Sequence, residues 1–258
     1  MKICLTNDDG ADHPGLLKLA SSLSKLGTLT VIVPSNQRSA TGKALTLNSP
    51  IRISEGILKD NYEMIKHSGL PADSVVLAKA FMTDIDLVVA GINGGANLGY
   101  QSMLTSGTVG AVFEGAIMGI PGIAFSMVVE PHEWFNSQGV QEDYQKAAEI
   151  ATGITEKVLS TGLPGGIDAI NVNFPSEISD NTKTVVTKPA KARIENELDR
   201  RIDPNGSPYY WLRGIPADAP AGTDAHEVLQ NGNISIAPII IDTVENEQIE
   251  QLKTLFSL

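Results

Sequence analysis

The chain has 258 residues, of which 42% are apolar and 19% are charged, and its formal net charge is −11. This composition is typical of a globular protein and excludes a disordered chain. The acidic balance argues against binding to a nucleic-acid polymer, which needs a basic patch or stripe, so an anionic ligand would have to be attracted locally.

The first part of the chain predicts alternating strands and helices. Residues 2–5 read as a strand that leads into the acidic loop at Asp8 and Asp9. An amphipathic helix is predicted from Pro14, with Gly27 placed to end it, and the β-branched run 28–33 predicts a buried strand. Shorter strands or a hairpin at the sheet margin are predicted over 44–47, 51–54 and 62–66.

The alternation continues to residue 174. The sequence predicts a helix beginning at Pro71, a strand over 86–90, a long glycine-rich loop over 91–106 and a helix over 107–119. It then predicts a strand over 122–127, an amphipathic helix around 144–158 and a strand over 169–174. Such alternation predicts an α/β fold with a mostly parallel sheet flanked by helices.

The pattern changes beyond about residue 175. Residues 176–230 are polar and rich in proline, and they are followed by a strand pattern over 233–241 and a helix over 244–255. We therefore predict a catalytic core over 1–175 and a C-terminal extension over 176–258. The extension comprises an arm for contacts between subunits and a closing strand and helix packed on the core, all within a single structural domain.

Three polar loops follow buried-type strands, and parallel strands bring such loops to one edge of the sheet. The first loop supplies Asp8 and Asp9, whose adjacent charges favour a divalent cation with oxygen ligands, Mg²⁺ or Mn²⁺. The other two loops supply hydroxyl, amide and cationic groups and a helix N-terminus at Gly107. Together the three loops predict a site for a phosphate group and a metal ion. The residues of the second and third loops are Asn36, Arg38, Ser39, Thr41 and Lys43, then Asn93, Asn97, Ser106, Gly107 and Thr108.

Several alternatives lack their motifs. Neither the P-loop motif nor the dinucleotide-binding glycine motif is present, and Ser106 and Ser126 lack the context of a hydrolase nucleophile. The four histidines show no metal-ligand spacing and read as surface or packing residues. The acids are adjacent rather than two apart, unlike the loop of phosphatases that form an aspartyl-phosphate, which favours water as the nucleophile.

Cys4 is the single cysteine, which fits a reducing compartment, and it reads as a buried inert thiol. The sequence has neither a signal-peptide pattern nor an apolar run of about 18 residues. We therefore expect a cytoplasmic protein with no membrane contact.

At these loops the sequence closely resembles the SurE family, the stationary-phase survival protein nucleotidases. The matching segments are TNDDG near the N-terminus, P-x-x-x-R-S-A-T-G at 34–42, GLPADSV at 69–75, VVAGINGGANLG at 88–99 and SGTVGAVFEGA at 106–116. A late GTD at 222–224 and ISIAPI at 234–239 also match. The chain departs from the family pattern at Leu70 and at His13, and the polar region matches only loosely.

The resemblance implies a Rossmann-like core and a divalent-metal-dependent phosphatase for nucleoside monophosphates. It implies one metal ion per subunit on Asp8, Asp9, Ser39 and Asn93, and a phosphate-holding set of Asn97, Ser106, Gly107 and Thr108. It further implies homodimers or homotetramers assembled through the C-terminal arm.

The resulting hypothesis is hydrolysis of nucleoside 5′- or 3′-monophosphates by water. Asp8 and Asp9 are the catalytic residues that would orient or deprotonate the water, with Arg38 or Lys43 assisting. Two alternatives stay open. One is a phosphatase in which Asp8 is a covalent nucleophile. The other is a non-catalytic nucleotide or phosphate sensor with the same loops.

Overall fold

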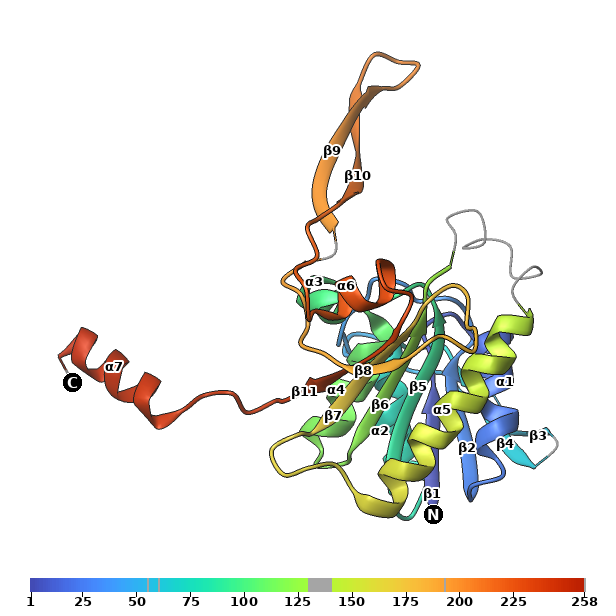
Figure 1. The fold of residues 1–258 in the computed structure, drawn as a ribbon. Helices are drawn as coiled ribbons and strands as arrows, with labels where there is room; N and C mark the ends of the chain where they lie inside the picture. The colour runs from blue at the N-terminus through green and yellow to red at the C-terminus, as the bar shows by residue number, and fades with distance from the viewer. Residues whose placement is uncertain (55, 60, 130–140, 193, 258) are drawn as a thin grey trace.

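The computed structural model describes residues 1–257 except 55, 60, 130–140 and 193 (Figure 1). These residues form a nine-stranded sheet in the order β3-β4-β2-β1-β5-β6-β7-β11-β8 and a separate two-stranded ribbon. The strands of the large sheet are β1 (Lys2–Thr6), β2 (Thr28–Pro34), β3 (Ile57–Lys59), β4 (Tyr62–His67), β5 (Leu87–Gly94), β6 (Gly122–Met127), β7 (Ala169–Phe174), β8 (Thr184–Val186) and β11 (Ile234–Ile239).

Most neighbouring strands of the large sheet run parallel. The pairs β2–β4, β1–β2, β1–β5, β5–β6 and β6–β7 are all parallel, whereas β3 and β11 pair antiparallel with β4 and β7. The α/β fold with a mostly parallel sheet is therefore confirmed. The strand order runs from β1 to β2 and β4 on one side and from β1 to β5 and β6 on the other, so the direction of strand succession reverses at β1. In open α/β sheets, ligands bind in the crevice outside the carboxyl ends of the strands at such a switch point.

Helices cover both faces of the sheet (Figure 1). One face carries α1 (Pro14–Leu23) and α5 (Gln141–Thr161), and the other carries α2 (Pro71–Phe81) and α4 (Gly107–Ile117). Two short helices, α3 (Gly99–Thr105) and α6 (Asp224–Leu229), lie near the carboxyl edge, and α7 (Asn246–Phe256) ends the chain. Among the helices that are described, none is long and apolar enough to cross a membrane.

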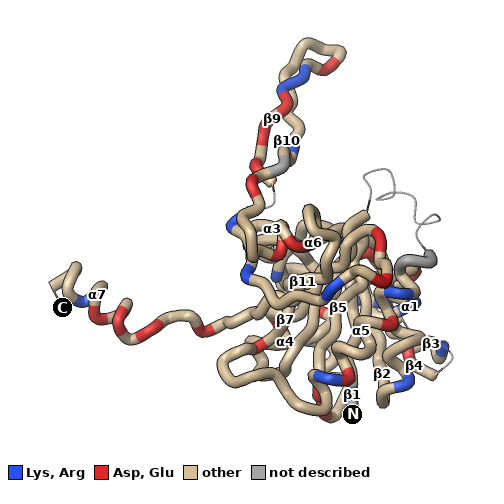
Figure 2. Tube along the Cα trace, in the orientation of Figure 1, with Lys and Arg blue, Asp and Glu red and all other residues tan. Residues whose placement is uncertain are grey.

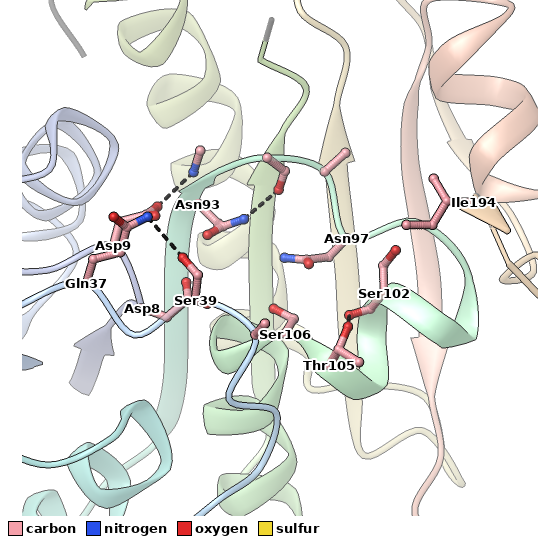
Figure 3. Close-up of a pocket in the computed structure, with 14 residues that line it drawn as sticks. Asp8, Asp9, Gln37, Ser39, Asn93, Asn97, Ser102, Thr105, Ser106 and Ile194 are labelled. Atoms are coloured by element: carbon pink, nitrogen blue, oxygen red, sulfur yellow. Dashed lines mark hydrogen bonds between the residues drawn. The ribbon is translucent and has the colours of Figure 1, made fainter. Parts of the chain in front are cut away.

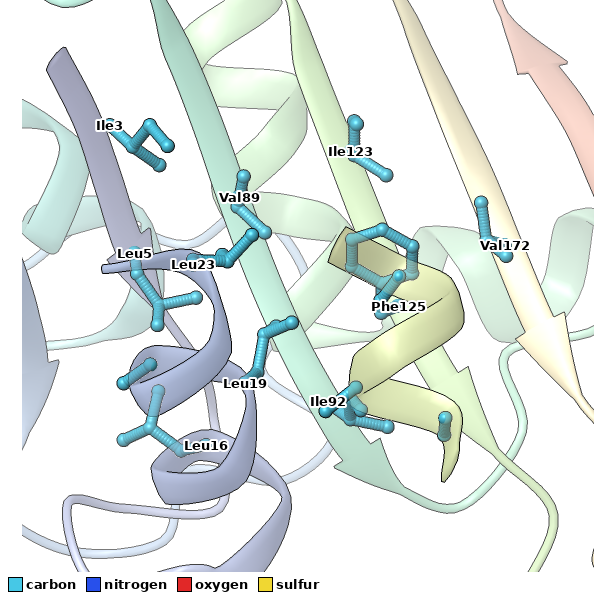
Figure 4. Close-up of a cluster of buried hydrophobic side chains, with 14 of the residues drawn as sticks. Ile3, Leu5, Leu16, Leu19, Leu23, Val89, Ile92, Ile123, Phe125 and Val172 are labelled. Carbon is cyan, nitrogen blue, oxygen red and sulfur yellow. The ribbon is translucent and has the colours of Figure 1, made fainter. Parts of the chain in front are cut away.

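The side chains of the strands alternate between the two layers, as the pleat of a strand requires. Ile3 and Leu5 of β1 pack under α1, where Leu16, Leu19 and Leu23 recur at helical spacing and are fully buried (Figure 4). Each such side chain contributes about 1.5–3 kcal/mol by leaving water. This packing fixes the direction of β1 and of the acidic loop at its end.

Four predictions of secondary structure were wrong. Residues 44–47 and 51–54 form no strand, and Ile53 makes only an isolated bridge with His67. The segment predicted as one long loop over 91–106 instead continues β5 to Gly94, past a register shift between Ala90 and Asn93, and then forms α3. The first helix ends at Leu23, before Gly27.

The C-terminal extension differs from the prediction in how it packs. Its strand β11 lies inside the large sheet, between β7 and β8. Two further strands, β9 (Ile194–Ile202) and β10 (Pro208–Pro216), form an antiparallel hairpin that projects from the body (Figure 1). The expected packing of the closing helix on the core was wrong, because α7 has no buried residue and lies away from the body, with acidic residues along it (Figure 2).

Candidate active site at the carboxyl ends of β1 and β5

A cavity of about 590 Å³ opens where β1 and β5 end (Figure 3). The loop after β1, the loop after β2, the end of β5, helix α3 and the first residue of β9 all contribute to it. Its lining residues are Asp8, Asp9, Gln37, Ser39, Ala40, Asn93, Gly94, Gly95, Ala96, Asn97, Ser102, Thr105, Ser106 and Ile194.

Local hydrogen bonds shape the acidic loop. The side chain of Asn7 accepts from the N–H of Gly10 and donates to its carbonyl, both at 3.1 Å, which closes a tight turn around the two acids. Gly10 takes a φ of +97°, a conformation that favours glycine. The turn directs Asp8 and Asp9 toward different partners.

Asp8 lies against the N-terminus of α4. Its Oδ2 accepts from the backbone N–H of Gly107 at 3.1 Å, and its Oδ1 accepts from the hydroxyl of Thr108 at 2.5 Å. A Cβ on Gly107 would lie 2.8 Å from the Cβ of Asp8, so only glycine permits this approach. The positive end of the helix dipole therefore faces the Asp8 carboxylate.

Asp9 lies between β5 and the start of α1. Its Oδ2 accepts from the N–H of Gly94 at 2.8 Å, and Nε2 of His13 lies 3.7 Å from the same oxygen. His13 caps α1 by accepting from the N–H of Gly15 through Nδ1, and its ring meets Tyr144 of α5 edge-on at 5.4 Å. The Oδ1 atom of Asp9 has no protein partner among the described residues.

Burial makes the ionised acids costly. It raises the pKa of Asp8 to about 7, with the charge of Asp9 as the second cause, against the hydrogen bonds from Thr108. Burial also raises the pKa of Asp9 to about 6. Two adjacent carboxylates with raised pKa values at a cavity wall are the arrangement that a cation relieves.

The predicted metal ligands line one cavity. Asp8, Asp9, Ser39 and Asn93 are all among its lining residues (Figure 3). The amide nitrogen of Asn93 donates a hydrogen bond to the carbonyl of Gly95 at 2.5 Å, which leaves the Oδ1 of Asn93 to act as a metal ligand. Ser39 Oγ accepts a hydrogen bond from Gln37 at 2.9 Å. All four side chains offer hard oxygens, the donor type that Mg²⁺ and Mn²⁺ prefer. The residues present therefore fit such an ion.

The predicted phosphate set divides into two pairs. Asn97 and Ser106 line the cavity, whereas Gly107 and Thr108 do not and instead donate to Asp8. Ser106 Oγ accepts from the N–H of Val109 as the cap of α4, so its own hydrogen remains for another acceptor. Asn97 donates one amide hydrogen to Ser126 at 2.8 Å and retains the second.

The two cations considered for assistance are engaged elsewhere. Arg38 donates from Nη2 to the carbonyl of Ser68 at 2.9 Å, and its backbone N–H donates to the carbonyl of Asp8 at 2.6 Å. Lys43 forms an ion pair with the buried Glu114 of α4. Neither lines the cavity, so the structure gives them a part in holding the second loop in place.

The sequence reasoning missed three residues around the cavity. His13 read as a surface or packing residue, yet it contacts Asp9. Gln37 bonds the hydroxyl of Ser39. Ile194 comes from the polar region whose contacts no sequence pattern indicated. The GTD segment is the nearest signal, because its Asp224 accepts from the N–H of Ala190, four residues before Ile194.

Fold and site together define a Rossmann-like α/β protein with an acidic, amide-rich ligand site at the switch point of its sheet. The chain belongs to the family described as Survival protein SurE, whose model matches residues 3–196.

Relatives and a solved structure agree with this membership. The chain is 44% identical to the 5′-nucleotidase SurE of Thermofilum pendens, over 93% of this chain and 90% of that protein. It is 38% identical to the 5′-nucleotidase SurE of Methanocella arvoryzae, over 98% and 97%. The crystal structure of the SurE protein from Aquifex aeolicus is 32% identical and superimposes with a TM-score of 0.82 over 99% of both chains.

Proposed function

We propose that this chain is a phosphomonoesterase that hydrolyses nucleoside 5′-monophosphates, 3′-monophosphates or both to nucleoside and phosphate. The observation that carries the proposal is the meeting of Asp8 and Asp9 with oxygen and amide groups in one cavity at the switch point. The names of the two relatives above, both 5′-nucleotidases, support it.

The same residues support dependence on one divalent metal ion per subunit, Mg²⁺ or Mn²⁺. Asp8, Asp9, Ser39 and Asn93 would hold the ion through their side-chain oxygens. When bound, such an ion supplies charge neutralisation to a phosphate group and makes a water molecule more acidic. The raised pKa values of the acids support this assignment, because a cation lowers the cost of keeping both ionised.

The protein groups around the acids have distinct roles in the proposal. Ser106 and Asn97 donate to the phosphate oxygens, because each retains a hydrogen directed at no other residue described above. Asp9 Oδ1 is the candidate acceptor for the proton of the attacking water. Asp8 is held at both oxygens and only 4% exposed, which favours a fixed ligand over a covalent nucleophile.

Phosphate release from a panel of 5′- and 3′-nucleoside monophosphates tests the proposal, run with Mg²⁺, with Mn²⁺ and with a chelator. Metal-dependent release that differs between substrates is the expected result. Saturable nucleotide binding without release in any metal would instead support the sensor. Label from a phosphorylated substrate on acid-quenched protein would support the covalent route through Asp8.

We further propose that the chain forms homodimers or homotetramers through its C-terminal extension. The hairpin exposes Leu198 and Leu212, which are directly opposed in register, together with Trp211. Helix α7 exposes Ile249, Leu252 and Phe256 on one side. Exposed apolar groups of this density on projecting elements are typical of surfaces that another chain covers.

A further inference from the structure

One wall of the cavity comes from the C-terminal extension. Ile194 is the first residue of β9, yet it lines the cavity together with the acidic pair of the first loop. Figure 3 shows it across the cavity from Asp8 and Asp9, beyond Asn97 and Ser102. The residue is half-buried, and its side chain carries no polar group. The cavity is therefore polar at one end and partly apolar at the other.

The second strand of the hairpin makes room for Ile194. A Cβ on Gly214 of β10 would lie 2.7 Å from Cδ1 of Ile194, so the isoleucine side chain occupies the space that glycine leaves. Ile194 pairs in register with Pro216 at the base of the ribbon. The position of Ile194 is therefore set at the base of the hairpin and does not depend on the projecting tip.

Asp224 links Ala190, four residues before Ile194 in the sequence, to the start of α3 at the rim of the cavity. Its Oδ2 accepts from the N–H of Gly99, the first residue of α3, and its Oδ1 accepts from the N–H of Ala190, both at 2.8 Å. The carbonyl of Ala190 accepts from the N–H of Tyr100 at 2.8 Å. Asp224 is fully buried, so these bonds are shielded from water. Helix α3 and the segment leading to β9 are thereby held together.

The two ends of the cavity match the two parts of a nucleotide. The acids, Ser106 and Asn97 suit a phosphate and its metal ion, whereas Ile194 offers apolar surface at the other end, with Ser102 nearby (Figure 3). A nucleoside presents an apolar base face and a hydroxylated sugar. Apolar walls with a few polar groups are how small-molecule sites bind and orient such ligands.

We propose that Ile194 is a specificity-determining residue that contacts the nucleoside part of the substrate, and that Asp224 is the positioning residue that holds it there. The proposal rests on the nucleotidase function proposed above. It gives the C-terminal extension a direct part in substrate choice, because a residue outside the predicted core completes the substrate site.

The test uses the two reaction products as separate probes of the two ends. Inhibition constants are measured for the free nucleoside and for inorganic phosphate, alongside KM and kcat for the best nucleotide of the panel. In Ile194→Ala, we expect the nucleoside inhibition constant and KM to rise about tenfold, with kcat and the phosphate constant within about twofold of the wild type. Ile202→Ala, the same truncation at the exposed far end of β9, is expected to change none of them.

Asp224→Asn keeps the shape of the side chain but places an NH₂ group at the position of one carboxylate oxygen, although both oxygens accept from backbone N–H groups, those of Gly99, Ala190 and Ala225. We expect it to raise KM without lowering kcat, and to add little in the Ile194→Ala background, because both substitutions act on the same contact. Circular dichroism confirms that each variant is folded. Additive effects of the two substitutions would remove Asp224 from the proposal.

The Ile194 proposal is overturned if folded Ile194→Ala has the wild-type inhibition constant for the nucleoside. It is also overturned if the inhibition constants for phosphate and for the nucleoside rise by the same factor. Should Ile194→Ala not fold, Ile194→Val gives the same comparison with a smaller change, expected at about threefold in the nucleoside constant. A wild-type chain that releases no phosphate from any nucleotide overturns the proposed function instead, so the two failures are distinct.

Discussion

Asp8 and Asp9 lie side by side and buried. Among the described residues, the partners of their carboxylates are N–H and O–H groups and the ring of His13. Such groups stabilise a carboxylate only in part, which is why the pKa of each acid stays raised. A bound cation would supply the missing charge. The two acids are therefore expected to matter for activity more than for stability.

The first prediction concerns Asp8→Asn. We expect phosphate release to fall at least about a thousandfold, because the substitution removes a charged metal ligand from the reacting end of the cavity. We expect the metal-free variant to be at least as stable as the wild type at pH 8, because the ionised Asp8 opposes folding there. Phosphate assays and thermal unfolding measure both effects.

Asp12→Asn is the matched control for this variant. Asp12 lies in the same loop, but its side chain is 81% exposed and contacts Lys66 rather than the cavity. The control is expected to retain wild-type activity. Near-normal turnover by folded Asp8→Asn in metal-containing buffer would remove Asp8 from the mechanism.

A second prediction follows from the competition between protons and metal. The folded-state pKa values of Asp8 and Asp9, about 7 and about 6, exceed those of the unfolded chain. This pair therefore costs the metal-free protein stability as the pH rises from about 4 through 7. Saturating Mn²⁺ should raise Tm by roughly 5–10 °C at pH 8 and by much less at pH 5.5.

Thermal unfolding with and without Mn²⁺ at the two pH values provides the measurement. Asp9→Asn should abolish most of the shift, whereas Asp12→Asn should keep it. A shift of equal size at both pH values would show that the metal binds away from the buried acids.

At the scale of residues, the sequence predicted which side chains would meet at one cavity, but not the directions in which N–H and O–H groups point. Asp8, Ser39 and Asn97 were expected to meet because each follows the carboxyl end of a parallel strand, and all three line one cavity. Whether the N–H of Gly107 faces a ligand or a neighbouring side chain depends on its approach to Asp8, which no pattern encodes. Ile194 reaches the cavity through tertiary contacts of the extension and has no local signal.

At the scale of elements, a buried hydrogen-bond chain joins three of the pieces that surround the site. His67 at the end of β4 accepts from the N–H of Gly69 through Nδ1, at 3.1 Å, so its Nε2 carries the proton and donates to Ser74 of α2, at 2.7 Å. Thr6 of β1 donates to the same Ser74 hydroxyl at 2.9 Å. This chain holds the end of β1, and so the acidic loop, against α2.

The third prediction concerns acid stability through His67. Burial, with a smaller effect from Arg38, lowers the pKa of His67 to about 4, although Asp73 opposes the shift. Its contribution to stability is complete above about pH 6.5 and is lost as the pH falls toward 4. Between pH 7 and pH 5 the loss amounts to about 2 kcal/mol.

Denaturant unfolding of the wild type and of His67→Gln at pH 7 and pH 5 isolates this contribution. The variant keeps a donor for Ser74 but does not titrate, so its free energy of unfolding should fall by about 2 kcal/mol less between the two pH values. A fall equal to that of the wild type would mean that His67 is not the group responsible.

Strongly patterned elements matched the sequence, and weakly patterned ones did not. The buried strands β6 and β7 lie where they were expected, at Gly122–Met127 and Ala169–Phe174. The segment after Ala90 was read as loop because glycine and asparagine dominate it, yet pairing with β6 carries β5 on to Gly94. Residues 44–47 look like a strand, but Asp73 instead ties Thr46 to the start of α2 at 3.0 Å.

At the scale of the whole molecule, the extension belongs to the body in two of its parts. Strand β11 is buried within the sheet, and Asp224 joins the region before β9 to α3. The hairpin and α7 project outward with exposed apolar groups (Figure 1). The polar composition predicted that this region buries too little apolar surface to be stable alone. The place of β11 inside the sheet could not be predicted, because it depends on pairing between distant segments.

The last prediction tests whether these projecting elements join subunits. Helix α7 carries Ile249, Leu252 and Phe256 on one side, all at least 40% exposed. Burying such a stripe against a second subunit would stabilise the assembly by about 25 cal/mol per Å² of apolar surface. Leu252→Glu would place a charge in that interface, and we expect it to reduce the assembly from a dimer or tetramer to a smaller species. Thr254→Glu adds the same charge to the polar side of α7 and should leave the mass unchanged.

Sedimentation at several concentrations measures the mass, and circular dichroism confirms that the helix content is kept. A wild-type monomer at every concentration, or an unchanged mass in Leu252→Glu, would contradict assembly through α7. Retained phosphate release by a smaller species would show that the cavity needs only its own chain.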